Sequence, residues 1–385
     1  MIQLKDICDI YDCPHTTAKD EGKGYPLVRT PNVGKGRLIL DGIHRVSEDV
    51  YNSRNARAIP EEGDLILARE APVGNVSIIM DGQRVCLGQR VVLIKPKREL
   101  VDPHFLTYYL LSAEVQHRLK NHANGAVVAH LNVSDIRNLW VTLPELEEQV
   151  AIGKILRSID DKIELNRQIN DNLEQQAQAA FNNIIANTTS DKTVQLSEIA
   201  WLNPKRSISK GKVARSIEMA HLPTTGSFPS GWEMKEYNGG MKFQNGDTLM
   251  ARITPCLENG KVAFVNFLED DEIAFGSTEY ITMTPKRQFA PEVLYFLVRN
   301  AEFIDFAVKN MNGSSGRQRV SADTIGTFEL PDITLEELHI LEAIAREALT
   351  KIKYNSLENM RLAEMRDTLL PKLMSGELKI NEIDC

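Results

Sequence analysis

The sequence has little of what an exported, membrane-spanning or zinc-binding protein would need. Five cysteines occur among 385 residues and none forms a Cys-x-x-Cys pair, so we expect reduced thiols rather than disulfides or a zinc site. No run of 18 or more apolar residues exists to cross a bilayer. The first residues include acidic side chains and lack the basic and apolar regions of a signal peptide. These absences predict a cytoplasmic protein.

The residue patterns of common catalytic sites are missing as well. There is no G-x-G-x-x-G after a predicted strand and no G-x-x-x-x-G-K-[ST], so a dinucleotide or P-loop site has no support. The histidines form no H-x-x-x-H ligand pair. Asn203-Pro204 lacks the aromatic partner expected of an amino-methyltransferase motif, and Asp160-Asp161-Lys162 is interpreted as solvated charge on a helix surface. We therefore predict no catalytic residues, no cofactor and no metal in this chain.

A surplus of positive charge is also missing, since the formal net charge is −8. The acidity is confined to two segments, residues 144–187 and 331–385, where acidic side chains outnumber basic ones. Residues 1–143 and 188–330 are close to neutral. Near neutrality permits a local basic patch in these two segments but does not predict one.

What the sequence does contain is a tandem repeat with a period of about 188 residues. The matching segments keep their order with small insertions. They are Glu62-Gly63-Asp64-Leu65 with Asn245-Gly246-Asp247-Thr248, Asp102-Pro103 with Ala290-Pro291, Gly125 with Gly313, Asp135 with Asp323, and Leu143-Pro144 with Leu330-Pro331. An ordered series of this kind indicates two copies of one structural unit.

Each copy begins with a compact α+β domain, at residues 1–143 and 188–330. Short β-type runs alternate with Gly, Pro and Asn turns in both segments. One helix is expected in each domain, near residues 104–120 and 292–309. A glycine-containing loop follows each helix, at Asn124-Gly125 and at Asn312-Gly313.

The segments 144–187 and 331–385 carry heptad patterns, with apolar residues spaced alternately by four and three. The first pattern runs through Ile152, Leu156, Ile159, Ile163, Leu173, Ala177, Ala180 and Ile184, and the second through Leu341, Ala345, Ala348, Ile352, Leu362, Arg366, Leu369 and Leu373. Both are interrupted at the same two layers by asparagine, Asn166 and Asn170 in the first and Asn355 and Asn359 in the second. Arg366 departs from the repeat, because the equivalent position holds Ala177.

An antiparallel pairing of these helices about their centres would set Asn166 opposite Asn359 and Asn170 opposite Asn355. Buried asparagines would then fix the register of the pair. The alternative is that the asparagines lie on a solvated face. About 32 paired residues would give a spacer of roughly 48 Å. Pro371 is expected to interrupt the second helix near its end, and Gly376 is expected to end it.

The predicted fold is therefore α+β, with two similar globular domains separated by two long antiparallel coiled-coil helices in a pseudo-twofold arrangement. Two recognition surfaces roughly 48 Å apart would meet duplex DNA about 14 base pairs apart at ~3.4 Å per pair. Because the domains are similar but not identical, the two halves of such a target should differ.

The sequence resembles the specificity subunits of type I restriction-modification systems over nearly its whole length. The resemblance is carried by Leu143-Pro144, Glu148-Gln149, Ile155-Leu156, Ile159 to Ile163, Asn166, and the run from Leu369 to Glu377. It implies a non-catalytic subunit that binds double-stranded DNA, in which each domain reads half of an asymmetric bipartite target. It also implies that the helices set the gap and dock two modification (methyltransferase) subunits, which restriction (motor-nuclease) subunits join. S-adenosylmethionine, ATP and Mg would belong to those partners.

Base readout needs donors and acceptors on loops, with Arg suited to guanine and Asn or Gln to adenine. The candidates are Arg29, Asn32, Lys35, Arg37, Arg69, Asn75, His130 and Asn132 in the first domain, and Arg252, Asn259, Lys261, Arg317, Gln318 and Arg319 in the second. Arg69 and Arg252, at matching positions after a strand, could instead hold the domain's shape through a carboxylate. Any other candidate could be a solvated charge or a turn residue.

Two other functions fit parts of the sequence. A protein-interaction scaffold without nucleic acid would explain the paired helices. Such a scaffold does not require donor-rich loops on two equivalent domains. A self-contained nuclease or methyltransferase is disfavoured by the missing motifs.

Overall fold

The computed structural model describes residues 1–122, 130–188, 190–286, 289–314 and 316–380. The predicted Asn124-Gly125 loop lies outside these residues. The chain forms two compact units, unit 1 with residues 1–162 and 362–385, and unit 2 with residues 163–361. Each unit joins one globular domain to segments of both long helices. The division into four consecutive segments stays a prediction.

Unit 1 is built on a five-stranded sheet. Its strand order is β2 (Cys8–Asp12), β9 (Val91–Pro96), β6 (Leu65–Ala68), β7 (Val76–Ile78) and β4 (Gly36–Arg37). Strand β6 is buried on both faces, because Leu65 and Leu67 pack into one apolar cluster and Ile66 and Ala68 into another. Its continuous apolar run is typical of a strand covered on both sides. A smaller sheet holds β5 (Arg45–Val46), β3 (Tyr25–Val28) and β8 (Cys86–Leu87).

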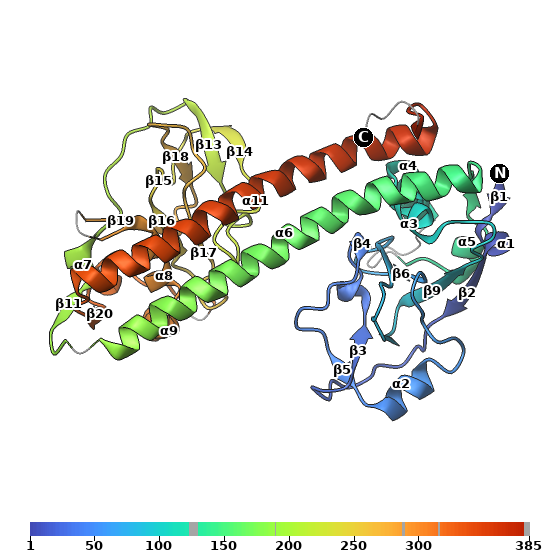
Figure 1. Cartoon of the computed structure of the whole chain (residues 1–385), viewed down its shortest axis with the longest axis horizontal. Helices are drawn as coiled ribbons and strands as arrows, with labels where there is room; N and C mark the ends of the chain where they lie inside the picture. Colours follow the sequence, from blue (N-terminus) through green and yellow to red (C-terminus); the bar gives the residue numbers. More distant parts are fainter. Residues whose placement is uncertain (123–129, 189, 287–288, 315, 381–385) are drawn as a thin grey trace. The chain divides into compact units, whose positions relative to one another are not determined.

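Unit 2 repeats the central strand order. Its first sheet runs β12 (Ala200–Leu202), β19 (Tyr280–Pro285), β16 (Thr248–Ala251) and β17 (Val262–Phe264), in the order of β2, β9, β6 and β7. The second sheet runs β14 (Glu233–Glu236), β13 (Val213–Ile217), β18 (Ala274–Gly276) and β15 (Met241–Phe243). Figure 1 labels strands β13 to β19 within unit 2. The repeat found in the sequence is therefore a repeat of structure.

Short elements complete each domain. In unit 1 they are β1 (Ile2–Gln3), which pairs with β10 (Trp140–Val141), the helices α1 (Leu4–Ile7), α2 (Glu48–Arg54) and α5 (Val133–Arg137), and the 3-10 turn at Thr30–Asn32. In unit 2 they are β11 (Thr193–Gln195), which pairs with β20 (Glu329–Pro331), and the helices α7 (Leu196–Ile199) and α10 (Ala322–Gly326). The β1–β10 and β11–β20 pairs bring the two ends of each domain together.

The prediction of one helix in each of these two segments is wrong, because each segment forms two helices. Unit 1 has α3 (Pro103–Leu111) and α4 (Ala113–His122), and unit 2 has α8 (Pro291–Val298) and α9 (Ala301–Lys309). Ser112 adopts an extended backbone between α3 and α4, and its hydroxyl donates to the Tyr109 carbonyl at 2.7 Å. Asn300 is also extended and caps α9 with its side chain. Each break thus has a local side-chain bond, from Ser112 to the end of α3 and from the start of α9 to Asn300, and needs no glycine or proline.

The long helices are α6 (Leu146–Asn187) and α11 (Leu335–Ser375). Thr334 and Glu337 form a capping box at the start of α11, with Glu337 N donating to Thr334 Oγ1 at 3.2 Å and Thr334 N to the Glu337 carboxylate at 2.9 Å. Pro371 does not interrupt α11, which continues to Ser375 and ends at Gly376 with a φ of 73°. In the described part of the chain, no helix is long and apolar enough to span a membrane.

Within unit 2 the two helices pair antiparallel (Figure 1). Asn166 Nδ2 donates to Asn359 Oδ1 at 2.9 Å, and Asn355 Nδ2 donates to Asn170 Oδ1 at 2.8 Å. These are the facing pairs that the heptads predict. Asn166 is 1% exposed, so it does not lie on a solvated face. The predicted class, α+β domains combined with long antiparallel helices, is confirmed.

Candidate functional site

Arg69 stands at the end of β6 in unit 1 and is held on several sides by the fold. Its Nη1 lies 2.9 Å from the Asp12 carboxylate, and its Nε donates to the Leu131 carbonyl at 2.8 Å. Its Nη2 lies 2.7 Å from Nε2 of His130, whose Nδ1 lies 2.6 Å from Glu70. Arg69 is buried. These contacts support a structural role for Arg69, and DNA contact by Arg69 or His130 stays a prediction.

Unit 2 repeats the backbone hydrogen bond at the end of this strand, but different charged side chains surround it. Val320 N donates to the Arg252 carbonyl at 3.0 Å, as the corresponding residues of unit 1 do at 3.1 Å. Arg319 stands where unit 1 has His130, and donates to the Glu279 carboxylate at 2.7 to 3.0 Å. The hydrogen bond from Arg319 lowers the pKa of Glu279. One scaffold thus carries different donor groups in the two domains.

The segment 317–319 is joined to the strand end that carries Arg252. Ile253 pairs with Arg319 through a backbone bridge, and Thr254 N donates to the Gln318 carbonyl at 3.1 Å. The structure therefore brings together two sets of predicted residues that are more than sixty positions apart in the sequence.

Some polar groups of the loop of residues 29–37 form hydrogen bonds within the domain. Asn32 is buried and accepts a hydrogen bond from Arg29 N at 3.1 Å. Asn75 donates to a backbone carbonyl of this loop at 2.9 Å. Lys35 is exposed on the same loop. Asn75 and Asn32 therefore shape the loop, and Lys35 is available at its surface.

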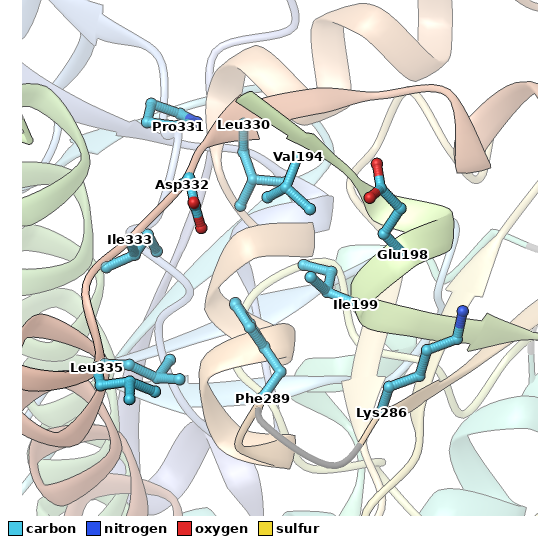
Figure 2. A pocket seen from close by; sticks show the side chains of 11 residues that line it. Val194, Glu198, Ile199, Lys286, Phe289, Leu330, Pro331, Asp332, Ile333 and Leu335 are labelled. Atoms are coloured by element: carbon cyan, nitrogen blue, oxygen red, sulfur yellow. The ribbon is translucent and has the colours of Figure 1, made fainter. Parts of the chain in front are cut away.

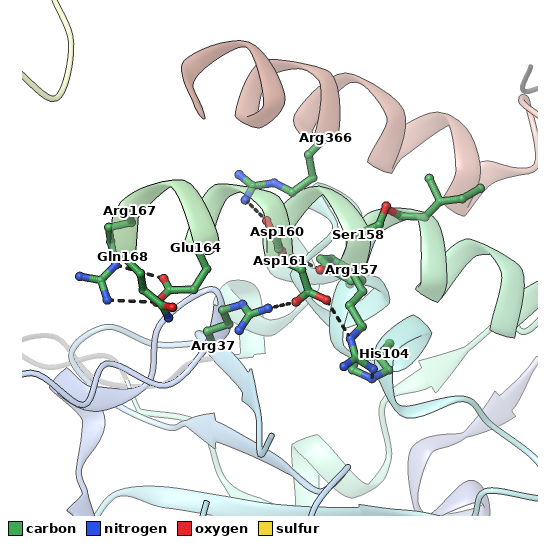
Figure 3. Close-up of polar contacts among 12 residues, drawn as sticks. Arg37, His104, Arg157, Ser158, Asp160, Asp161, Glu164, Arg167, Gln168 and Arg366 are labelled. Carbon is green, nitrogen blue, oxygen red and sulfur yellow. Dashed lines mark hydrogen bonds and ion pairs between the residues drawn. The ribbon is translucent and has the colours of Figure 1, made fainter. Parts of the chain in front are cut away.

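Arg37 contributes to a charged cluster beside α6 in unit 1 (Figure 3). It forms an ion pair with Asp161, whose carboxylate also lies 3.3 Å from Arg157 Nε. Arg157 Nη1 lies 2.9 Å from His104 Nε2. Burial and the charge of Arg157 lower the pKa of His104, which favours the neutral imidazole. Arg37 is thus engaged within the protein, and its DNA contact stays a prediction.

The remaining candidates differ in exposure. Lys261 Nζ donates to the Met219 carbonyl at 2.7 Å, and Asn132 donates to Asp135 at 3.0 Å. The predicted side chains that are exposed are Lys35, Asn132, Asn259 and Arg317. Exposed cations and amides of this kind can donate to phosphate oxygens or base edges.

The sequence did not identify a buried carboxylate on α6 in unit 1. Asp160 is 8% exposed, accepts a hydrogen bond from the Tyr108 hydroxyl at 2.6 Å, and lies 2.8 Å from Arg366 Nη1 (Figure 3). The interpretation of Asp160 as solvated charge is therefore wrong. Arg366, the one departure from the repeat, was the available signal, because a cation at a heptad position needs an anionic neighbour.

Unit 2 has a buried carboxylate of its own on α6. Glu174 accepts a hydrogen bond from the Tyr295 hydroxyl at 2.6 Å, and Arg299 Nε lies 3.7 Å away. Burial raises the pKa of Glu174, although the tyrosine and arginine act in the opposite direction. Each domain thus bonds to α6 through a tyrosine, Tyr108 on α3 and Tyr295 on α8, although the two are one position out of register in the repeat.

A cavity of about 320 Å³ lies in unit 2 beside β11, α7 and β20 (Figure 2). Its lining is mainly apolar, with Glu198, Lys286 and Asp332 as the charged members. Lys286 donates to a backbone carbonyl and lies 4.3 Å from the centroid of the Trp201 ring. Among the residues that the structure describes, no three His, Cys, Asp or Glu side chains gather as metal ligands would. In the described part of the chain, the exposed loop residues are therefore the candidate functional site.

The known proteins that this chain resembles are specificity subunits of type I restriction-modification systems. Residues 1–175 match the family described as the type I restriction modification DNA specificity domain. The chain is 22% identical to the HindI specificity subunit of Haemophilus influenzae, over 84% of this chain and 88% of that one. It is 24% identical to the MjaIX specificity subunit of Methanocaldococcus jannaschii, over 99% and 94%.

Other similarities are partial or concern the fold alone. The match to the putative MjaX specificity subunit of Methanocaldococcus jannaschii is 28% identical, but covers 47% of this chain and 40% of that protein. The S subunit of a type I restriction-modification system from M. genitalium has the same fold, with a TM-score of 0.59 at 17% identity over 97% of this chain and 95% of that one. Over most of its length the chain is thus similar to specificity subunits of type I restriction-modification systems, and its first 175 residues match their DNA specificity domain.

Proposed function

We propose that this chain selects an asymmetric, two-part DNA sequence for a type I restriction-modification complex in the cytoplasm. The observation that carries the proposal is the repeat of one strand order in two domains with different side chains at equivalent positions. His130 and Arg319 are one such pair. Two related domains with different donors are suited to two different half-sites.

The loops at the ends of these strands would make the DNA contacts. Exposed Lys35 and Arg317 would neutralise phosphates, and exposed Asn132 and Asn259 would donate to base edges or to the backbone. Buried side chains such as Arg69 would hold the loops in shape. Affinity would therefore fall with rising salt concentration.

The two long helices would set the gap between the half-sites and dock two modification subunits. Restriction subunits would join the resulting complex. S-adenosylmethionine, ATP and Mg would be bound by these partners, while this chain contributes recognition. The asparagine pairs, each with one buried and one half-buried member, support a helix pair with one fixed register.

Reconstitution tests this function. The modification subunit, purified with and without this chain, is incubated with genomic DNA and S-adenosylmethionine, and methylated positions are sequenced. We expect methylation at one two-part motif when both proteins are present, and none with either protein alone. The same motif methylated in the absence of this chain would contradict the proposal, as would methylation without any motif in its presence.

A further inference from the structure

We propose that Tyr108, through Asp160 and Arg366, is a positioning residue that holds the first recognition domain in one orientation on the helices, and thereby restricts the gap between half-sites that the complex accepts. The inference rests on the proposed function. It assigns gap selectivity to a defined hydrogen bond rather than to helix length alone.

The contact is buried and directional. Tyr108 lies on α3 and is 6% exposed, and its hydroxyl donates to Asp160 Oδ2 at 2.6 Å. Arg366 on α11 lies 2.8 Å from the other oxygen, Oδ1. One carboxylate therefore joins the recognition domain to both helices within unit 1. Hydrogen bonds to a charged acceptor are shorter and stronger than those between neutral groups.

The corresponding layer of unit 2 is apolar. The shift of 189 residues that relates the two heptad patterns places Leu349 at the position of Asp160 and Ala177 at that of Arg366. Leu349 and Ala177 are both buried in one apolar cluster. An ion pair at this layer is therefore not needed to pack the helices.

The second domain uses a different attachment point. Tyr295 on α8 donates to Glu174 at 2.6 Å, and Glu174 lies two heptads beyond Asp160 along α6. Both tyrosines thus bond to the same helix, α6. Each domain thus has its own tyrosine hydroxyl bonded to a carboxylate of α6, at positions that the repeat does not align, as expected if each bond fixes the orientation of its own domain.

A physical reason connects this bond to selectivity. An apolar contact between α3 and α6 would tolerate small rotations, because apolar packing is not directional. A rotation that separates Tyr108 from Asp160 leaves the buried tyrosine hydroxyl without its acceptor. It also removes one hydrogen bond from the buried Asp160 carboxylate. The native orientation of the first domain is therefore more stable than slightly rotated orientations. Because the orientation of the domain sets where it meets DNA, one separation of the half-sites is favoured as well.

The test uses Tyr108→Phe, with Tyr109→Phe as the matched control. Both tyrosines lie on α3 and are 6% and 7% exposed, but the Tyr109 hydroxyl accepts a hydrogen bond from Thr142 N at 3.0 Å and stays within the domain. Each variant is co-expressed with the modification subunit in a host without this methylation, and methylated sites are sequenced. The readout is the ratio of methylation at gaps one base pair longer or shorter to that at the native gap.

We expect Tyr108→Phe to raise this ratio roughly tenfold, since a hydrogen bond to a charged group is involved. Tyr109→Phe should keep the wild-type ratio. The double variant Asp160→Leu/Arg366→Ala, which copies the layer of unit 2, should also raise the ratio while the chain stays folded.

An unchanged ratio in both Tyr108→Phe and the double variant would overturn the inference, and so would an equal rise in Tyr109→Phe. These outcomes differ from a failure of the proposed function, in which the wild-type chain would direct no two-part motif.

Discussion

At the residue scale, the repeat preserves a buried carboxylate in each domain but changes its cation. Asp64 bonds to Lys95 Nζ at 2.8 Å, whereas Asp247 bonds to Arg206 Nη2 at 2.8 Å. Burial raises the pKa of both carboxyl groups, while their cations act in the opposite direction. Each also accepts a backbone N–H from three residues earlier at 2.8 Å. The repeated Gly-Asp pair is therefore structural.

Arg206→Met tests this role. The substitution leaves Asp247, which is 0% exposed, without its cation, and should lower the free energy of unfolding by roughly 3–5 kcal/mol at neutral pH. Urea unfolding of the full chain, followed by tryptophan fluorescence, reports on unit 2 through Trp201 and Trp232.

The loss should shrink as the pH falls. A carboxyl whose folded pKa is raised destabilises the fold above its unfolded pKa, and this penalty disappears once the group is protonated in both states. The penalty at about pH 5 should therefore be smaller than at about pH 7.5. Lys205→Met, at the exposed neighbouring residue, is the control. Equal losses for Arg206→Met at the two pH values would contradict this account.

At this scale some contacts could be predicted from the sequence and others could not. The asparagine pairs could be predicted, because the heptad layers and an antiparallel pairing about the helix centres together set which layers face one another. The Tyr108–Asp160 bond could not, because it joins residues 52 positions apart and depends on how α3 packs on α6. The sequence left open two roles for Arg69, and only the folded backbone places it against Asp12 and Leu131.

At the element scale, periodicity predicted the long helices well and the short ones poorly. A heptad pattern extends over many turns, so α6 and α11 were evident, including the end of α11 at Gly376. The breaks between α3 and α4 and between α8 and α9 come from single residues, Ser112 and Asn300. The effect of Pro371 was overestimated, because the proline removes a single backbone donor and only the last turn of α11 follows it.

The asparagine layer of unit 2 allows an element-scale prediction. Asn166→Leu alone should lower the free energy of unfolding by about 1–2 kcal/mol, because it leaves the amide of Asn359 with one partner fewer. The double variant Asn166→Leu/Asn359→Leu should regain this loss and exceed the wild type, since an apolar pair replaces a buried polar one.

The measurement is again urea unfolding of the full chain, compared among wild type, single and double variants. A double variant less stable than the single one would show that the asparagines stabilise the helix pair rather than specify its register.

At the scale of the whole molecule, the chain carries the same α+β architecture twice. The repeat of the strand order could be foreseen, because ordered motif matches across 188 residues require two copies of one unit. The second sheet of unit 2, with four strands against three in unit 1, could not, since its strands are short and irregularly spaced. Differences of this kind between the domains are expected if each one reads its own half-site.

The most direct test of the central claim is to sequence methylated bases in genomic DNA from the source cell, with this gene intact and with it deleted. Partner subunits must be expressed in both strains. The account predicts that deletion abolishes methylation at one asymmetric, two-part motif, which would also supply both half-sites. An unchanged methylation pattern would contradict the account, and would favour a scaffold that tethers partner proteins without reading DNA.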